Sequence, residues 1–307
     1  MRELQIISEV FPDLSWTRTQ RITDGWDHVV VILDGALVFR FPIDPAYLHS
    51  LRTEIDVLNF LADRLTARIP RYNWVAPDHS FAGYPLLPGR PLTVAEIASL
   101  TPEATVAASD QLADFLSSLH SLPIQGTPLG RVPPTDLAQD RQDVLNLVRK
   151  HLRLKMTPFE LATIDRILHD VEEIQTKNHI SVLIHNDLYS SHLLWDSTTS
   201  RLGVIDFSDM CIGEPAMDFS RLFEFGPSMV EAVYSKYAGP KDSTFLDRAW
   251  TYWEWYSVYS LTDHFEVGRT TWSEARQCFD QVIRPTGEDP VPPACIGSLE
   301  GQDPLKS

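Results

Sequence analysis

The spacing of apolar and polar residues predicts that the first part of the chain is rich in strands. A β-branched run at 29–33 and a second apolar run at 36–41 flank Asp34-Gly35, a dipeptide that favours a tight hairpin turn. The segment 73–89 predicts two more short strands before it ends at Pro88-Gly89. Apolar residues that recur at helical spacing predict two helices in the same part of the chain, at 3–11 and 48–65.

The pattern becomes mainly helical after Pro88-Gly89, and only the stretch at 182–210 reads as strand, loop and short strand pair. Six helices are expected there, at 93–100, 102–122, 136–155, 158–176, 216–237 and 243–266. We therefore predict an α+β protein with a small strand-and-helix lobe at 1–88, a larger helical lobe at 89–284 and a Pro/Gly-rich tail at 285–307. A small ligand is expected to bind in the cleft between the two lobes.

The charge balance narrows the choice of partners. The 307 residues contain 26 Lys plus Arg against 42 Asp plus Glu, a formal net charge of -16. Nucleic acid and anionic membrane surfaces are poor partners for such a chain, because binding phosphates needs a basic surface. A cationic small molecule would be attracted by the same charge. Taken alone, the charge balance favours the simpler explanation, an acidic surface that only keeps the protein soluble.

Cysteine usage and the N-terminus point to the cytoplasm. Three widely spaced cysteines, Cys211, Cys278 and Cys295, have no metal-binding spacing and are expected to be free thiols in a reducing compartment. The N-terminus lacks the apolar run of a signal peptide, and no apolar stretch reaches the length of a membrane span. We expect a cytoplasmic protein, and a monomer, because no charged or apolar stripe suggests an interface.

Two acidic residues follow short apolar runs within 182–210. Asp187 and Asp206 are each expected at the end of a strand, where a carboxylate can bind Mg²⁺ and Mg²⁺ can bind phosphates. One acid that accepts a hydroxyl proton beside a second that holds metal is the arrangement of phosphoryl transfer to an alcohol. His192 stands five residues after Asp187, where the kinase catalytic loop has Asn, and Asp206-Phe207-Ser208 takes the place of D-F-G.

A basic residue and an acidic residue in the first lobe complete this pattern. Kinases pair a strand cation with a helix Glu to hold the nucleotide phosphates. Arg40 in the strand "LVFRFP" and Glu54 in the helix "SLRTEIDVL" occur in that order and setting. A glycine-rich loop is nearly absent, since only Gly25 occurs before the first strand run.

Seven sequence blocks in consistent order are similar to the aminoglycoside phosphotransferases, antibiotic kinases with a two-lobed protein-kinase-like fold. The blocks are "GWDHVVVILDGALVFRFP", "RTEIDVLNFL", "GYPLLPGRPL", "LADFLSSLHSLP", "HNDLYSSHLLWD", "GVIDFSD" and "GEPAMDFSRLFE". The resemblance runs from about residue 18 to about residue 268. It is closest to the branch that phosphorylates the 2''-hydroxyl of gentamicin- and kanamycin-like drugs, and macrolide phosphotransferases are similar too. It implies Mg²⁺-dependent transfer of the γ-phosphoryl group of ATP or GTP to a hydroxyl of a cationic antibiotic, which confers resistance.

The resemblance also assigns roles to individual residues. It implies that Asp187 is the catalytic base and that Asp206 and His192 are ligands of the metal ion. Arg40 and Glu54 are implied at the nucleotide phosphates, and the purine is expected at the hinge residues Tyr84, Leu86 and Leu87. The catalytic loop is expected to be supported by His185 and Asp218. The residues expected to meet the substrate and its amines are Asp209, Glu224, Trp253, Glu254 and Asp263.

Three departures from the family pattern keep alternatives open. Arg40 replaces the usual Lys, Ser208 replaces the Gly of D-F-G, and His192 is a softer ligand than Mg²⁺ prefers. One alternative is a kinase of the same fold whose acceptor is a macrolide or a small metabolite. Another is a catalytically inactive, kinase-shaped binding protein. The expected substrate acids could also be ordinary exposed helix charges, and Trp253 could belong to the core.

Overall fold

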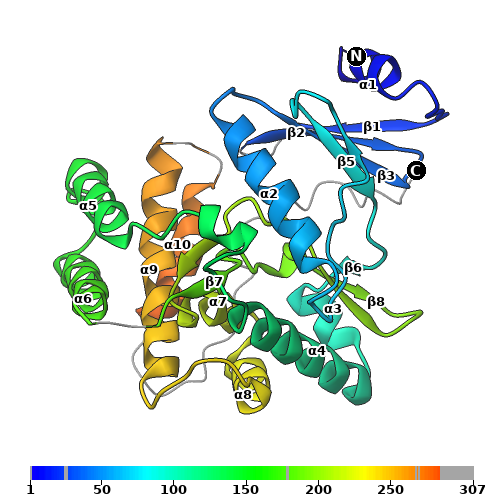
Figure 1. Cartoon of the computed structure of the whole chain (residues 1–307). Coiled ribbons are helices and arrows are strands. Elements are labelled where there is room, and N and C mark those ends of the chain that lie inside the picture. Colours follow the sequence, from blue (N-terminus) through cyan, green and yellow to red (C-terminus); the bar gives the residue numbers. More distant parts are fainter. Residues whose placement is uncertain (1, 24–26, 178–179, 267, 269, 284–307) are drawn as a thin grey trace.

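The structure, a computed structural model, consists of a small lobe built around a sheet and a larger, mainly helical lobe (Figure 1). It describes residues 2–23, 27–177, 180–266, 268 and 270–283. The predicted tail at 285–307, with Cys295, and the single loop glycine, Gly25, lie outside the described residues. The two-lobed α+β architecture predicted from the sequence is confirmed.

The small lobe is a five-stranded antiparallel sheet with the strand order β1-β2-β3-β5-β4. Its strands are β1 (Thr19–Ile22), β2 (His28–Leu33), β3 (Leu37–Pro42), β4 (Trp74–Val75) and β5 (Ala82–Pro85), and its helices are α1 (Arg2–Val10) and α2 (Tyr47–Leu61). Successive side chains of a strand point to opposite faces of the sheet. Phe39 of β3 therefore packs with Ile7 of α1, whereas Val38 packs with Leu51 of α2. Arg40, two residues after Val38, faces the α2 side.

The predicted hairpin is confirmed, with its turn at the expected dipeptide. Asp34 has φ 52° and Gly35 has φ 66°, the left-handed conformation that a two-residue turn between twisted strands requires at both central positions. The Asp34 carboxylate also accepts hydrogen bonds from the backbone of Thr17 and Arg18, at 2.9 and 2.7 Å. The turn thereby fixes the β2–β3 register, in which Arg40 lies opposite Val30.

The large lobe packs its helices around α9 (Phe245–Glu266), which contacts α6, α7 and α10. The other helices and turns of this lobe are α3 (Val94–Ser99), α4 (Pro102–His120), η1 (Pro128–Arg131), α5 (Leu137–Leu147), η2 (Val148–Leu152), α6 (Pro158–Gln175), η3 (Ser190–His192), α7 (Ala216–Ser220), η4 (Arg221–Phe225), α8 (Pro227–Lys236) and α10 (Trp272–Val282). Two small sheets carry the polar loops: β6 (Arg90–Pro91), β8 (Leu193–Asp196) and β9 (Arg201–Val204) form one, and β7 (Val182–Ile184) and β10 (Cys211–Gly213) form the other.

Some elements differ from the sequence prediction for identifiable reasons. The helix expected at 216–237 is interrupted, because Gly226 adopts φ 90° and Pro227 then starts α8. Helix α10 was not predicted, although Thr271 and Glu274 form a capping box at its start. Strand β1 was also missed, because its residues alternate between exposed and partly buried and carry only a weak apolar signal.

The two lobes share one apolar core. A single cluster of buried residues runs from Leu51 and Leu58 of α2 to Leu116 of α4 and Leu193 of β8. The chain passes from the first sheet to the second between Pro85, the end of β5, and Arg90, the start of β6. Of the helices in the described part of the chain, none combines the length and apolar character needed to cross a membrane.

Candidate active site

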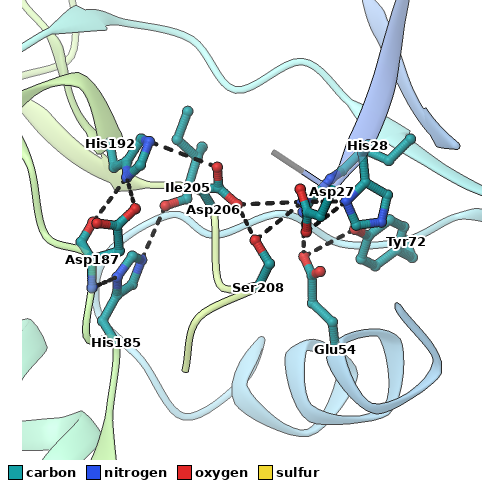
Figure 2. A network of polar contacts seen from close by, with 11 residues as sticks. Asp27, His28, Glu54, Tyr72, His185, Asp187, His192, Ile205, Asp206 and Ser208 are labelled. Atoms are coloured by element: carbon teal, nitrogen blue, oxygen red, sulfur yellow. Dashed lines mark hydrogen bonds and ion pairs between the residues drawn. The ribbon is translucent and has the colours of Figure 1, made fainter. Parts of the chain in front are cut away.

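The loop between β7 and η3 presents Asp187, and His185 holds this loop in place. The imidazole of His185 is fully buried, with Nε2 3.0 Å from the carbonyl oxygen of Ile205 and Nδ1 accepting the backbone N–H of Asp187 at 3.2 Å. Burial lowers the pKa of His185, so the ring is neutral and uses both nitrogens as structural contacts. His185 thus ties the loop after β7 to the loop after β9 (Figure 2).

Asp218 supports the same loop from helix α7. Its Oδ2 accepts the backbone N–H of His185 at 2.9 Å, and its Oδ1 accepts that of Asn186 at 2.7 Å. His120 contacts Asp218 Oδ2 at 3.0 Å and the hydroxyl of Tyr237 at 2.7 Å, all within the core. Asn186 has φ 67°, a left-handed conformation that a non-glycine residue keeps only when its surroundings enforce it. The buried carboxylate supplies that enforcement through two charge-assisted hydrogen bonds.

The two acids predicted from the strand ends converge on one imidazole (Figure 2). Nδ1 of His192 lies 2.8 Å from the carbonyl oxygen of Asp187 and 3.2 Å from its Oδ2, while Nε2 lies 3.7 Å from Oδ2 of Asp206. Burial opposes a positive charge on His192, but the hydrogen bond to Asp187 and the charges of Asp187 and Asp206 outweigh it and raise its pKa to about 9. Without a ligand, His192 is therefore a cation between two carboxylates.

Arg40 joins this group from the small lobe. Its Nη1 donates to Glu54 of α2 at 2.7 Å, and its Nη2 lies 3.3 Å from both Asp206 Oδ1 and Ser208 Oγ. Burial opposes ionisation of Asp206, but the charges of Arg40 and His192 and the hydrogen bond from Ser208 hold the pKa of Asp206 below its usual range. The buried guanidinium therefore links Glu54 of helix α2 to Asp206 of the large lobe.

Three residues that the sequence did not assign to the site complete the Arg40 network. His28, at the start of β2, places Nδ1 3.1 Å from Arg40 Nη2 and 2.8 Å from the carboxylate of Asp27. The hydroxyl of Tyr72 donates to Glu54 Oε1 at 3.0 Å. Asp27 and His28 stand before a β-branched run, which hints at a strand entry, but their contact with Arg40 depends on strand pairing that no local pattern encodes.

The acids expected to meet a substrate are mostly occupied by internal contacts. Glu224 accepts the backbone N–H of Ser190 at 3.1 Å and its hydroxyl at 2.6 Å, and Glu254 is held by Arg166 at 2.7 and 3.2 Å. Both carboxylates are buried. Trp253 is buried in the core cluster of α6, α9 and α10, and Asp263 is buried and accepts a hydrogen bond from Thr270 at 3.2 Å. Four of the five expected residues therefore have internal contacts instead of a place on an open substrate surface.

Asp209 is the exception. It follows the Asp206 loop, its side chain is exposed, and its backbone carbonyl accepts from Asn186 Nδ2 at 3.3 Å. Protein atoms nevertheless surround much of the carboxyl, and this partial desolvation, together with the charges of Asp187 and Asp206, raises the pKa of Asp209 to about 7. Asp209 is thus an accessible acid beside the catalytic loop.

The hinge residues lie at the crossing between the two sheets. Tyr84 is buried and packs edge-on against Tyr72, with ring centroids 5.2 Å apart, and Leu87 is buried in the shared core. Leu86 is exposed, but its backbone N–H already donates to the carbonyl oxygen of Ala36 at 2.8 Å. That donor is therefore committed to the sheet.

The sequence of the chain matches the model of a known protein family. The profile of the APH family, the phosphotransferase enzyme family, matches residues 18–256 of this chain. The chain belongs to this phosphotransferase family.

One curated protein and several solved structures are similar to this chain. The chain is 27% identical over 243 residues to the uncharacterized protein YcbJ of Bacillus subtilis strain 168, which covers 71% of this chain and 76% of that protein. Among solved structures, the GDP and kanamycin complex of APH(2'')-IIIa matches with a TM-score of 0.80 at 23% identity, covering 92% of this chain and 98% of that one. The structure of a type I macrolide 2'-phosphotransferase matches with a TM-score of 0.66 at 22% identity, covering 92% and 97%. These structures share the kinase-like fold of this APH-family chain.

The residues of this APH-family site fit a magnesium ion held mainly by one carboxylate. No group of three or more His, Cys, Asp or Glu side chains in the described ranges is arranged as a metal cage. Mg²⁺ in such enzymes is held by one or two protein ligands together with phosphates and water. Because Nδ1 of His192 faces the Asp187 carbonyl, its Nε2 is directed toward Asp206. Asp206 would hold the ion, and His192 would lie next to it.

Proposed function

We propose that this enzyme transfers the γ-phosphoryl group of ATP or GTP to a hydroxyl of a small molecule with the help of Mg²⁺. The proposal rests on the convergence of Asp187 and Asp206 on His192, with Arg40 on the other side of Asp206. An acid for the acceptor, an acid for the metal and a cation for the phosphates then lie within one connected group. This is the set of parts that phosphoryl transfer to an alcohol requires.

In this proposal each side chain has one task. Asp187 accepts a hydrogen bond from the acceptor hydroxyl, orients it and takes its proton as the new O–P bond forms. Arg40 binds phosphate oxygens with the edge of its guanidinium, through the Nη2 that now contacts Asp206 and Ser208. Asp206 holds Mg²⁺, which neutralises the charge on the phosphates when it is bound. His185 and Asp218 keep the loop of Asp187 in position.

An aminoglycoside is the first candidate acceptor. The net charge of -16 and the exposed Asp209 support a cationic ligand beside Asp187. Structural neighbours include complexes with kanamycin and with gentamicin. Phosphorylation of such a drug in the cytoplasm would protect the cell that contains the enzyme.

A macrolide-type acceptor is the second candidate, and one observation favours it. Glu224 and Glu254, which would have received drug amines, are buried in internal contacts. Tyr256, half-buried, and Tyr259, 46% exposed, lie about one turn apart on α9, and the Tyr256 hydroxyl donates to Oδ1 of Asn186 at 3.4 Å. We call these two rings the aromatic wall. A wall of aromatic rings suits a bulky acceptor with a large apolar surface.

The test is transfer of phosphate to a panel of acceptors. Purified protein is incubated with Mg²⁺, ATP or GTP, and aminoglycosides or macrolides, and products are detected by mass spectrometry. We expect a phosphorylated drug with the wild type, none with Asp187→Ala, and normal product with Asp114→Ala, which changes an exposed acid of α4. Nucleotide binding without any product across the panel would favour the inactive binding protein instead.

A further inference from the structure

Arg221 is a buried cation beside the catalytic loop, and no carboxylate of the described residues lies within ion-pair distance of it. Its side chain in η4 is 5% exposed, and its Nε and Nη1 have no hydrogen-bond partner within the described residues. Nor does any carboxylate in that part of the chain form an ion pair with it. Burying an unpaired charge is costly, so some other contact must compensate for the lost water.

Two tyrosine rings supply that compensation. The guanidinium carbon lies 3.9 Å from the ring centroid of Tyr189 and 3.3 Å from that of Tyr256. The cation is thus close to the face of both rings, where the aromatic quadrupole attracts it most strongly once water is excluded. Lysine could not replace this contact, because its ammonium is a point charge and only a planar guanidinium can stack on two rings at once.

The two rings belong to the two sides of the proposed acceptor site. Tyr189 lies in the catalytic loop, two residues after Asp187. Tyr256 lies on α9, and its hydroxyl is 3.4 Å from Oδ1 of Asn186, the residue before Asp187. Arg221 is therefore a spacer between the loop that carries Asp187, the proposed base, and the helix that carries the aromatic wall.

The same short turn also holds the next residue of the loop. Glu224, three residues after Arg221 in η4, accepts both the N–H and the hydroxyl of Ser190. One residue of η4 thus fixes Ser190 through directional hydrogen bonds, and another fixes Tyr189 by stacking. The Arg221 contact continues to Tyr256 of α9, and Phe223 of the same turn packs edge-on against Trp250 of α9, with ring centroids 5.0 Å apart.

We propose that Arg221 is a positioning residue for phosphoryl transfer, which holds the loop of Asp187 at a set distance from the aromatic face of α9 through the rings of Tyr189 and Tyr256. The inference rests on the proposed function, since it assigns the acceptor to the space between loop and helix. The nucleotide contacts, which involve Arg40 and Asp206, lie outside this stack.

The test compares Arg221→Lys, which keeps the charge and loses the plane, with Tyr256→Leu, which removes one ring, and with the double variant. Arg153→Lys, at an exposed arginine, is the matched control. Thermal unfolding first establishes that each variant is folded. Three quantities are then measured: affinity for ATP and GTP, kcat and KM for the acceptor, and hydrogen exchange of the backbone of residues 186–192.

We expect Arg221→Lys and Tyr256→Leu each to lower kcat/KM for the acceptor by about 10- to 100-fold, the loss typical of a small misplacement of a reacting group. Both should speed exchange at 186–192 and leave nucleotide affinity unchanged. The double variant should be no worse than the worse single variant, because both remove the same contact. Wild-type behaviour of Arg221→Lys, an equal loss of nucleotide affinity, or full additivity would each overturn the inference.

The exchange measurement needs no acceptor, which separates this inference from the proposed function. If the wild type phosphorylates none of the acceptors, the proposed function fails. Faster exchange at 186–192 in both single variants would still support the role of Arg221 in holding the loop, and unchanged exchange would reject it.

Discussion

The proposed nucleotide side and the proposed acceptor side of the site are built from different interactions. On the nucleotide side, Arg40 lies among Glu54, His28, Asp206 and Ser208, all within hydrogen-bonding or ion-pair distance. On the acceptor side, Arg221 lies between two rings with no acid as a partner in the described residues. We infer that Arg40 can exchange its protein partners for phosphates. Arg221, in contrast, holds the loop of Asp187 at a fixed distance from helix α9.

The largest expected effect is on kcat and comes from substitution of Asp187, which should leave nucleotide binding unchanged. Asp187→Asn keeps the size of the side chain but removes the proton acceptor, so kcat should fall by about 10²- to 10⁴-fold, the usual contribution of a general base. Nucleotide affinity, measured by calorimetry, should stay at the wild-type value. Retained turnover would place the base elsewhere.

Removing the cation of the nucleotide side should affect both folding and binding. Arg40→Met leaves Glu54 buried without its partner, and the free energy of unfolding should fall by about 3–5 kcal/mol. Adding Glu54→Gln to Arg40→Met should recover part of that loss of stability, which urea unfolding can measure. The double variant should still bind ATP or GTP weakly. If the double variant bound nucleotide normally, Arg40 would have no role at the phosphates.

A pH series tests the charge that His192 carries between the two acids. Its folded-state pKa of about 9 exceeds the ordinary 6.5, so protonated His192 stabilises the metal-free protein fully below pH 6.5. That contribution is lost as the pH rises through about 9. The stability difference between wild type and His192→Asn, measured by urea unfolding in EDTA, should therefore shrink by about 1–3 kcal/mol from pH 6 to pH 10. A difference that grows with pH would contradict the assignment.

On the acceptor side, Glu224 is expected to act on the loop and not on the acceptor. Glu224→Gln weakens the two bonds to Ser190, so stability should fall by about 1–3 kcal/mol, the cost of an imperfectly satisfied buried group. The KM for the acceptor should not change, and Ser190→Ala should behave alike. A selective rise in acceptor KM would restore Glu224 as a substrate residue.

The smallest effect concerns the exposed acid. At pH 8, above the Asp209 pKa of about 7, Asp209→Asn should raise KM for a cationic acceptor by about two- to fivefold, the range of a solvent-exposed charge pair, and the effect should weaken with salt. Glu254→Gln, whose carboxylate pairs with Arg166, should leave that KM unchanged. Equal effects of the two substitutions on KM would contradict the different roles assigned to Asp209 and Glu254.

The ion pair of Arg40 with Glu54 could be predicted from the sequence, whereas the stack around Arg221 could not, for physical reasons. The contacts of Asp187, Asp206, Arg40 and Glu54 follow from residues placed at strand ends and on one helix face, which short motifs record. The contacts of Arg221 depend on how α9 packs against η4. The spacing of Arg221 and Tyr256 along the chain does not predict that packing.

Two of the acids expected at the substrate illustrate the same limit. Glu224 and Glu254 occur on helices where an exposed charge and a buried one look alike in sequence. Their partners, Ser190 and Arg166, are 34 and 88 residues away, so only tertiary packing reveals that the carboxylates are occupied. The lobe boundary at 88–89 likewise remains a proposal, because a single apolar core continues across it.

The most direct test of the account is a crystal structure of the protein with Mg²⁺ and a non-hydrolysable triphosphate. We predict the ion on the carboxylate of Asp206, phosphate oxygens on Arg40, and the terminal phosphate facing Asp187. A triphosphate bound away from Arg40, or an Asp187 carboxyl turned away from the terminal phosphate, would contradict the proposal that these acids serve one transfer site.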